Sequence, residues 1–406
     1  MKKTFFLFLS ILCSYFVSSD AAASASPAEE FFAAVRAGRV QEVQRFLESP
    51  DFDVNQFSQV GNTALMFACY AGNLEMVNLL LDHPETDVNK QRRDGNTALF
   101  FAARQNHGHI ADRLLCEVSC DPNLSAVDMT LPIMFFIHHQ NTAAIESFIK
   151  HSISARSVLR RQLFGERAPI KLRVALDEHD SHDYTPLAQA AEFGNLELVK
   201  LLSDCPSVDI NKFSFGGTPL AIAAKNGHTN VVKYLLEFPE IDVVQGDPLF
   251  GAIDQMYLGA TQLLLAHPDI NTNQIMGEAE EGEEVTEGKT PLGKALMLCL
   301  NKAELQEWDD SDDPQQQQRG RSLRQNDYEM IKALVRCPGV NINLISWPST
   351  PLAIAIEKER VDLVDEVMQR RDLNVNIPDN FGFTPLMLAA KNGNKAIIDR
   401  LFTYPE

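Results

Sequence analysis

The sequence predicts an all-α protein, folded as a solenoid of about ten stacked helix-turn-helix units with short hairpin turns and three loop insertions. Two observations carry this prediction. The motif Gly-Asn-Thr-Ala-Leu occurs at residues 61–65 and again at 95–99, 34 residues later. Thr-Pro-Leu then recurs at 185–187, 218–220, 290–292, 350–352 and 384–386. A period near 33 residues is typical of arrays in which each unit buries its apolar face against the next one.

The first 25 residues are expected to be a signal peptide that is not part of the fold. Lys2 and Lys3 precede an apolar run over residues 5–17, and small residues in an Ala-x-Ala pattern follow it. This three-part pattern predicts cleavage near Ala23 or Ala25 and a secreted or periplasmic mature chain. An uncleaved anchor is the alternative. No second long apolar run follows, so we expect no transmembrane segment in the mature chain.

Each repeated unit opens with a threonine or its replacement. The Thr hydroxyl can cap free backbone N–H groups at a helix start, and a following proline suits the first helical turn. These opening residues are Thr63, Thr97, Thr130, Thr185, Thr218, Asp247, Thr290, Thr350 and Thr384. Four of their spacings are 33 or 34 residues, and the three longest indicate units that carry insertions.

The second half of the unit contains a bend, a second helix and a polar tail. A glycine suited to a left-handed bend occurs at positions 38, 72, 194, 227 and 393. Apolar residues with helical spacing follow it, as in Leu-Glu-Leu-Val-Lys-Leu-Leu at 196–202, and a proline ends the helix. The tail is Asp-Val-Asn at 53–55 and 87–89. Its spacing lacks the dense ligand pattern of a calcium loop, so we interpret it as turn chemistry.

Helix, glycine, helix and a turn leading to Gly-x-Thr-Pro-Leu together resemble the ankyrin repeat, over nearly all of residues 28–406. The family often has His after Thr-Pro-Leu, but Ala188, Ala221 and Gly293 stand there, which puts one capping or inter-repeat hydrogen bond in doubt. Glu359 and Cys299 replace two familiar glycines, so their units should be less regular. The resemblance implies a solenoid that binds protein partners non-covalently.

Insertions divide the expected array. Repeats are expected at 27–151 and 184–406, with a basic and acidic insertion at 152–183 between them. This insertion could bind a partner or be a solvated segment beside an acidic surface. Two further insertions, at 277–288 and 302–326, are polar and are expected to be disordered loops. The third separates the two helices of one unit.

No catalytic motif was found: the chain has no Walker phosphate loop, Gly-x-Ser-x-Gly, His-Glu-x-x-His or dinucleotide fingerprint. We therefore expect no enzyme activity and no cofactor. The alternative is a metal-dependent or catalytic factor that uses residues 152–183, because His179, Asp180 and His182 could ligate a transition metal. Cys116 and Cys120 are close enough in sequence to form a disulfide, although buried thiols fit the helical pattern better.

Candidate binding residues follow from the resemblance, because ankyrin partners are usually held by the exposed side of the first helices and by the hairpin tips. Aromatic and arginine side chains favour binding hot spots. The first-helix candidates are Phe67, Tyr70, Phe101, Arg104 and Phe193, and the tip candidates are Phe213 and Phe215. The formal net charge of −19 disfavours nucleic acid as a partner. We expect a monomer with a protein partner; a structural spacer or cargo carrier is a third reading.

Overall fold

The computed structural model describes residues 26–124, 130–152, 175–276, 289–299, 302–310 and 313–404. These residues form 21 helices and, within the described ranges, no strand longer than an isolated β-bridge. The predicted all-α ankyrin-type solenoid is confirmed. The predicted signal peptide at 1–25, most of the insertion at 152–183 and the insertion at 277–288 lie outside the described residues.

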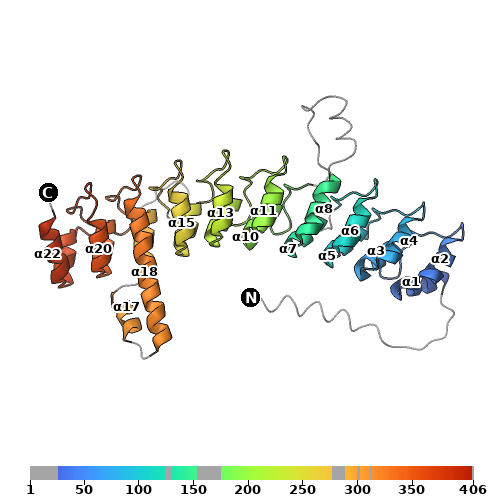
Figure 1. Ribbon diagram of the computed structural model, residues 1–406, viewed down its shortest axis with the longest axis horizontal. Coiled ribbons are helices and arrows are strands. Elements are labelled where there is room, and N and C mark those ends of the chain that lie inside the picture. The colour runs from blue at the N-terminus through green and yellow to red at the C-terminus, as the bar shows by residue number, and fades with distance from the viewer. Residues whose placement is uncertain are drawn as a thin grey trace, which may run out of the picture. The chain divides into compact units, whose positions relative to one another are not determined.

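The chain divides into two compact units, Met1–Val127 and Asp128–Glu406, called unit 1 and unit 2 below. Unit 1 contains three helix-turn-helix repeats (Figure 1). Their first helices are α1 (Pro27–Arg36), α3 (Ala64–Ala71) and α5 (Ala98–Arg104). Their second helices are α2 (Val40–Leu47), α4 (Leu74–Leu81) and α6 (Gly108–Leu115).

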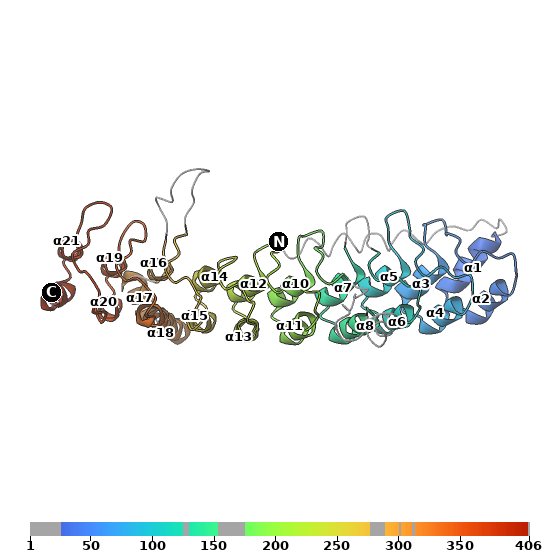
Figure 2. The ribbon, with the colours of Figure 1, turned by 90° about the horizontal axis from the view of Figure 1, so that it is seen from above.

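Unit 2 contains seven repeats, so the described chain has the predicted ten. Its first helices are α7 (Pro132–His138), α10 (Pro186–Phe193), α12 (Pro219–Lys225), α14 (Pro248–Asp254), α16 (Pro291–Leu298), α19 (Pro351–Glu357) and α21 (Pro385–Lys391). Its second helices are α8 (Thr142–Ser152), α11 (Leu196–Ser203), α13 (Thr229–Leu235), α15 (Leu258–Leu265), α18 (Pro314–Arg336), α20 (Val361–Val367) and α22 (Lys395–Thr403). Within each unit, first helices form one row and second helices another, with the hairpins on the first-helix side (Figure 2).

Threonine caps begin most first helices, as predicted. The Thr63 hydroxyl accepts a hydrogen bond from the backbone N–H of Met66 at 3.3 Å, and six other threonines do the same three residues ahead. Two predicted openings differ. The N-cap of α7 is Leu131 rather than Thr130, and Asp247 stands in a left-handed conformation at the start of α14 without a side-chain cap.

The bend between the two helices needs a left-handed residue in almost every repeat. Gly72 has φ 70°, and a Cβ there would lie 2.8 Å from the His107 ring. The His107 ring nitrogen Nε2 lies 3.3 Å from the Tyr70 carbonyl oxygen of the preceding repeat. This contact supports a packing role for the His-Gly-His sequence at this bend. Glu359 keeps the left-handed conformation without glycine, at φ 53°, so its bend is regular after all.

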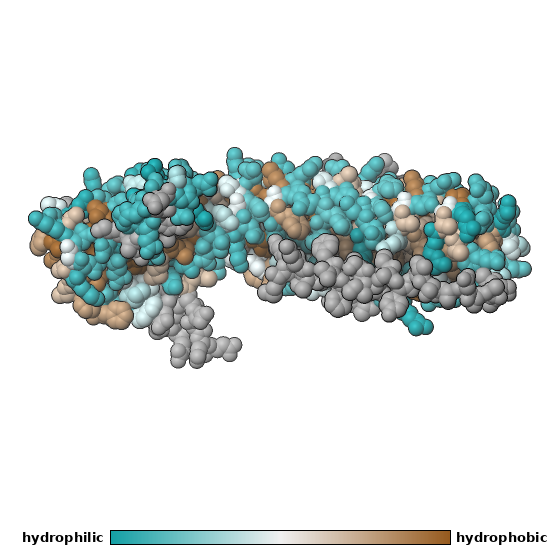
Figure 3. Space-filling model, turned by 90° about the horizontal axis from the view of Figure 1, so that it is seen from below, coloured by the Kyte–Doolittle hydropathy of each residue, from teal (hydrophilic) through white to brown (hydrophobic). Residues whose placement is uncertain are grey.

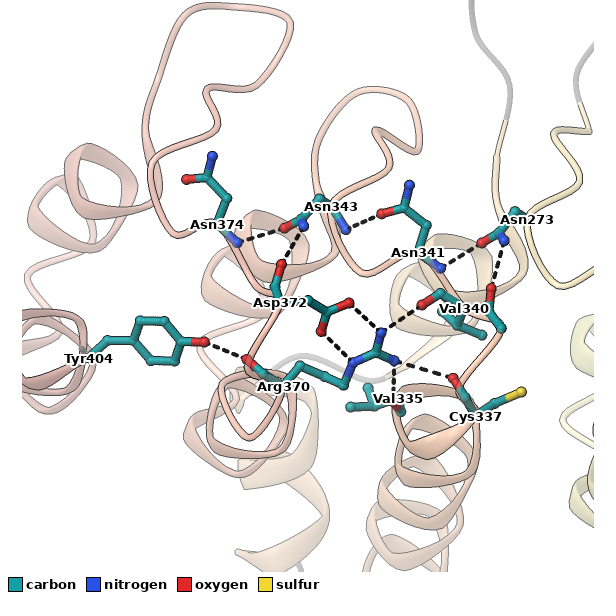
Figure 4. A network of polar contacts seen from close by, with 11 residues as sticks. Asn273, Val335, Cys337, Val340, Asn341, Asn343, Arg370, Asp372, Asn374 and Tyr404 are labelled. Atoms are coloured by element: carbon teal, nitrogen blue, oxygen red, sulfur yellow. Dashed lines mark hydrogen bonds and ion pairs between the residues drawn. The ribbon is translucent and has the colours of Figure 1, made fainter. Parts of the chain in front are cut away.

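The polar tail of each repeat links it to the next. The Asn55 side chain donates to the Glu85 carbonyl at 2.6 Å and accepts from the Asp87 N–H at 2.8 Å. The same pair of bonds, all between 2.6 and 2.8 Å, is made by Asn89, Asn211, Asn273 and Asn343. Figure 4 shows the last part of this series in unit 2. Turn chemistry is therefore confirmed for the tail, and it also holds repeats together.

Serine hydroxyls supply an inter-repeat bond where the family's usual histidine is missing. Ser214 Oγ and Ser346 Oγ, both fully buried, accept from the N–H groups of Thr185 and Thr290 at 3.2 and 3.0 Å. A Cβ on Gly293 would lie 1.9 Å from Ser346 Oγ, so glycine leaves room for that hydroxyl. The sequence-based doubt about an inter-repeat bond is thus resolved at these two hairpins by a different side chain.

The prediction of a disordered loop at 302–326 is wrong for the residues that the structure describes. Residues Lys302–Asp309 form α17, and α18 runs without a break from Pro314 to Arg336. Figure 1 shows α17 beside the part of α18 that extends beyond the neighbouring helices. Asp313 caps α18, and Arg324 pairs with Asp309 at 2.6 Å. Because extending an existing helix is cheaper than nucleating one, the polar Gln and Arg residues join the second helix of the repeat.

Two smaller expectations were also tested. Cys116 is exposed, Cys120 is buried, and within the described chain no disulfide joins them. None of the described helices is both long enough and apolar enough to cross a membrane.

Candidate binding face

The candidate binding residues of unit 1 lie on the side of the first helices that faces away from the second helices, here called the first-helix face. Two positions recur there with the 34-residue period. Arg36, Tyr70 and Arg104 each stand two residues before the left-handed bend residue. Phe67 and Phe101 stand three residues earlier. The regular period therefore aligns these side chains in two neighbouring rows.

Phe67 is half-buried between two neighbouring repeats. Its ring meets the Phe32 ring edge-on, with centroids 6.0 Å apart. The Arg36 guanidinium carbon lies over the same ring, 5.7 Å from its centroid. Such a cation–π contact is worth about 0.5–1 kcal/mol at an exposed site. Part of the Phe67 ring surface therefore supports Arg36 and part remains open to a partner.

Tyr70 and Phe101 repeat the same diagonal contact one repeat later, but with a different outcome for exposure. The Tyr70 ring meets the Phe101 ring edge-on at 6.2 Å. Tyr70 is 49% exposed, whereas Phe101 is only 6% exposed. The expectation that Phe101 faces solvent is wrong, because Tyr70 and Phe100 pack against it. Phe101 can act only by holding Tyr70 in place.

Arg104 ends α5 and its side chain is exposed. It occupies the position that Arg36 and Tyr70 hold in the preceding repeats. The structure thus brings together Phe67, Tyr70 and Arg104 on one face of unit 1, with Arg36 beside them. Arg36 was missed by sequence reasoning, although the 34-residue period that aligns it with Tyr70 is visible in the sequence.

The first-helix candidate of unit 2 is Phe193, at the end of α10. It is half-buried and meets the His138 ring of the preceding repeat edge-on at 5.9 Å. Phe193 therefore braces two repeats more than it offers an open surface. The exposed position next to it carries a different pattern from unit 1, because Glu192, Lys225 and Asp254 alternate in charge along successive repeats. Lys294 pairs with Asp254 at 2.6 Å.

The tip candidates Phe213 and Phe215 lie in the hairpin before α12 and are 54% and 64% exposed. Their backbone is held by the preceding hairpin. His179 Nε2 lies 2.9 Å from the Phe213 carbonyl oxygen, and the Phe215 N–H donates to the Asp183 carbonyl at 2.8 Å. The Tyr184 ring packs on Phe215 at 5.8 Å. A fixed backbone with exposed rings suits a binding tip.

The Tyr184 phenol is the titratable group nearest these rings. Burial raises its pKa, and the nearby Glu192 and Asp180 carboxylates raise it further. The phenol therefore stays protonated at neutral pH and remains able to donate a hydrogen bond.

The histidines and acids considered as metal ligands serve the hairpin instead. Asp180 accepts from the N–H groups of His182 and Tyr184, each at 2.9 Å. His179 is used by the contact with the Phe213 carbonyl. These are turn and inter-repeat bonds, and the two imidazoles have different partners.

Sequence reasoning underused further tip residues near the C-terminal end of unit 2. Phe381 is 68% exposed and lies 6.3 Å from the Trp347 ring. Phe383 is 41% exposed, with the Lys391 amine 5.6 Å from its centroid. A signal was present: like Phe215, both Trp347 and Phe381 stand three residues before a capping threonine. Figure 3 shows hydrophobic residues gathered at this end of an otherwise largely hydrophilic face.

Comparison with known proteins agrees with this architecture. The sequence matches the family described as ankyrin repeats (3 copies) over residues 31–126, 187–276 and 321–406. The chain belongs to the ankyrin-repeat family. No curated protein matches this ankyrin-repeat chain. Among solved structures, one described as the crystal structure of EF0377, an ankyrin repeat protein, is similar at 19% identity and a TM-score of 0.44. That match covers 53% of this chain and 100% of the other.

Ankyrin repeats generally mediate protein–protein interactions, and proteins built from them are typically non-catalytic scaffolds. The open side chains described above are the parts of this ankyrin-repeat chain available for such an interaction.

Proposed function

We propose that this chain is an exported scaffold that binds a partner protein non-covalently through its first-helix face and its hairpin tips. The observation that carries the proposal is the exposure of large aromatic side chains there. Tyr70, Phe213 and Phe215 are 49%, 54% and 64% exposed, although most other rings of unit 1 and of the hairpins have packing partners that cover them. Exposed aromatic side chains on a rigid backbone are typical of binding hot spots.

The rigidity of the array supports the same proposal. The side chains of Asn55 and Asn89 each make two hydrogen bonds to the next repeat, so the hairpins and helices are fixed before a partner arrives. A pre-organised surface loses little conformational entropy on association, and affinity rises accordingly.

Export is the part of the proposal that depends on the sequence pattern of residues 1–25 alone. Cleavage near Ala23 or Ala25 would leave Ser26, which caps α1 through the Glu29 N–H at 3.3 Å. The mature chain would be secreted or periplasmic. We further propose that it is a monomer that does not bind nucleic acid, because the charge of the chain is strongly negative.

The alternative, a metal-dependent or catalytic factor that uses residues 152–183, gains no support from the described part of that segment. Its histidines and Asp180 are engaged in hairpin bonds. The spacer or cargo-carrier alternative makes a different prediction: alanine substitution of the exposed rings would leave every interaction intact.

Affinity capture from the organism's own extracellular or periplasmic fraction tests the binding proposal. The baits are residues 26–406 as wild type, the site variant Tyr70→Ala/Phe213→Ala/Phe215→Ala, and the control variant Leu74→Ala/Val118→Ala. Leu74 and Val118 are exposed apolar residues on the second-helix side. We expect a protein captured by the wild type and the control but lost from the site variant. Equal capture by all three baits would contradict the proposal.

Mass spectrometry of the exported chain tests the location separately. We expect a mature N-terminus at residue 24 or 26. Recovery only of an intact chain in the cytoplasm would contradict export.

A further inference from the structure

The charged residues of unit 1 are segregated between its two sides. The first helices end in Arg36 and Arg104, and the hairpin over residues 90–96 contains Lys90, Arg92 and Arg93. Acidic residues are concentrated on the second helices and in the turns that follow them: Glu42, Glu48, Glu75, Asp82, Glu85, Asp112 and Glu117. A chain with a net charge of −19 therefore carries one side that is rich in positive charge.

Arg36 is the clearest member of this positive side. It is exposed, it lies over the Phe67 ring, and no described acidic side chain forms an ion pair with it. A guanidinium keeps five N–H donors in a fixed fork, and that geometry matches a carboxylate. Support from the ring restricts the side chain, so less entropy is lost when an anion binds. Arg36 is thus pre-positioned to bind a carboxylate.

Tyr70 stands between the two arginines in the same row. The order along the repeats is Arg36, Tyr70 and Arg104, with one side chain in each of three consecutive repeats. The exposed Tyr70 ring offers an apolar contact, and its hydroxyl offers a hydrogen bond. This row presents positive, aromatic and positive groups in sequence.

The hairpins extend the same chemistry beside the row. The Lys90 amine lies 5.6 Å from the centroid of the half-exposed Phe57 ring, again joining a cation to an aromatic of the preceding repeat. Arg92 donates to the Asn62 side chain at 3.1 Å and pairs with Asp94 at 3.2 Å, which neutralises that pair. Arg93 is exposed. The remaining charge of this hairpin is positive.

Glu29 and Glu30 are the acids of α1, and they lie in its first turn, away from Arg36 at its end. The Glu29 carboxylate accepts from its own N-cap and from the Gln59 side chain. It is therefore engaged at the hairpin end and leaves the Arg36 end of the helix positive.

We propose that the first-helix face of unit 1 binds an acidic, extended segment of a partner protein. Arg36 and Arg104 pair with carboxylates of that segment, and an apolar or aromatic side chain of the same segment packs on Tyr70. This inference rests on the proposed function and adds the chemistry of the partner. Opposite charges also speed the encounter and select against basic partners.

A protein segment fits this face better than a polyphosphate does. The acidic residues of the second-helix side repel a long polyanion, whose charge extends past a small positive face. A short acidic peptide places its charge only where the arginines are. Unit 2 offers no such face, because Glu192, Lys225 and Asp254 alternate along it.

The test uses residues 26–406 and a fluorescent random copolymer of glutamate and tyrosine, which has the proposed chemistry without a known identity. Binding is followed by fluorescence anisotropy at low ionic strength and at about 0.15 M salt, where surface charges are screened beyond roughly 8 Å. The site variant is Arg36→Ala/Arg104→Ala. The control Arg39→Ala/Arg45→Ala removes the same charge from the second-helix side.

We expect the wild type to bind the copolymer more weakly as salt rises. The site variant should bind at least about tenfold more weakly, because two charge-assisted contacts are lost, and the control should change affinity by less than about twofold. Reversal to Arg36→Glu/Arg104→Glu should abolish binding to this copolymer and permit binding to a lysine–tyrosine copolymer. Circular dichroism of each variant checks that it is folded.

Several outcomes would overturn the inference. Absence of copolymer binding would do so, as would equal losses in the site and control variants. Equal binding of RNA or of anionic vesicles, lost in the same site variant, would replace the proposed partner class. If a captured protein is lost with Tyr70→Ala/Phe213→Ala/Phe215→Ala but retained with Arg36→Ala/Arg104→Ala, the proposed function stands and this inference falls. If neither variant changes any protein binding, both fall.

Discussion

Unit 1 and unit 2 use the same backbone repeat but present different side chains at the same place on it. Two residues before the left-handed bend, unit 1 carries Arg36, Tyr70 and Arg104. The corresponding residues of unit 2 are His138, Glu192, Lys225, Asp254, Glu357 and Lys391. The first series is positive and aromatic, whereas the second is almost fully alternating in charge.

The difference teaches that the repeat separates stability from recognition. Capping threonines and tail asparagines make the same bonds in both units, so they hold the scaffold. The position before the bend makes no backbone bond that the fold requires and can vary. In unit 2 its charges partly satisfy one another, as in the pair of Lys294 and Asp254, while in unit 1 they are left for a partner.

Unit 2 also differs in burying ion pairs that unit 1 keeps at its surface. Arg360 is 3% exposed and pairs with Asp327 at 3.2 Å and with Asp362 at 2.6 Å. Arg39 of unit 1 pairs with Glu42 at 3.3 Å, with both side chains about half exposed. The buried network joins α18 to α20, so the helical insertion is fastened to the repeat stack through Arg360.

The largest expected effect breaks this contrast. Arg360→Ala leaves Asp327 buried without that partner and should lower the free energy of unfolding of the α18–α20 region by about 3–5 kcal/mol. Arg39→Ala should cost at most about 1 kcal/mol, because its pair is exposed. Amide hydrogen exchange in α18 and α20 for the first variant, and in α1 and α2 for the second, measures both. Similar losses in the two variants would refute the distinction.

A smaller effect sharpens the claim that the scaffold is common to both units. Asn89→Ala in unit 1 and Asn343→Ala in unit 2 each remove two inter-repeat hydrogen bonds and should each cost about 1–3 kcal/mol. Urea unfolding, followed by hydrogen exchange in the flanking helices, provides the measurement.

Asn376 is the matched control for these variants. It holds the same place in the final described repeat, where its side chain bonds to no described backbone group of a following repeat. Asn376→Ala should be near neutral. Costs that differ by more than about 2 kcal/mol between Asn89→Ala and Asn343→Ala would show that the two scaffolds are not equivalent.

The smallest effect concerns acid. Burial raises the pKa of Asp362, but hydrogen bonds from Arg360 outweigh it and hold the pKa below its usual range. Hydrogen bonds from Arg370 likewise lower the pKa of Asp372, which is largely exposed. A lowered carboxyl pKa contributes stability that is complete above the unfolded value, near about 4, and is lost as pH falls through the lower folded value.

We therefore expect unit 2 to lose a little stability below about pH 4, and the variant Arg370→Ala to lose less with acid than the wild type does. Thermal unfolding between neutral and acidic pH checks this. Identical acid dependence in the two proteins would count against the role of the Arg370–Asp372 pair. Arg370 also donates to the carbonyls of Val335, Cys337 and Val340, so the variant will be less stable at every pH (Figure 4).

Among the candidate binding residues, sequence patterns predicted position better than exposure. The 34-residue period placed Phe67, Tyr70, Phe101 and Arg104 on one face of the first helices, where the structure has them. It did not predict that Phe101 is buried while Tyr70 is open, because that depends on which ring of a neighbouring repeat covers the other. The tip rings Phe213 and Phe215 are exposed as expected, since hairpin tips have few neighbours.

The amino-acid sequence by itself determined the repeat, its helix starts and its turns, because caps, bends and tails are local interactions encoded within a few residues. The tertiary structure alone decided that polar residues 313–326 continue a helix, that Ser214 and Ser346 provide inter-repeat bonds, and that Arg360 is buried. Each of these outcomes depends on groups about 30 or more residues away in the chain. Only the stacking of one repeat on another brings such groups within bonding distance, and no local pattern records it.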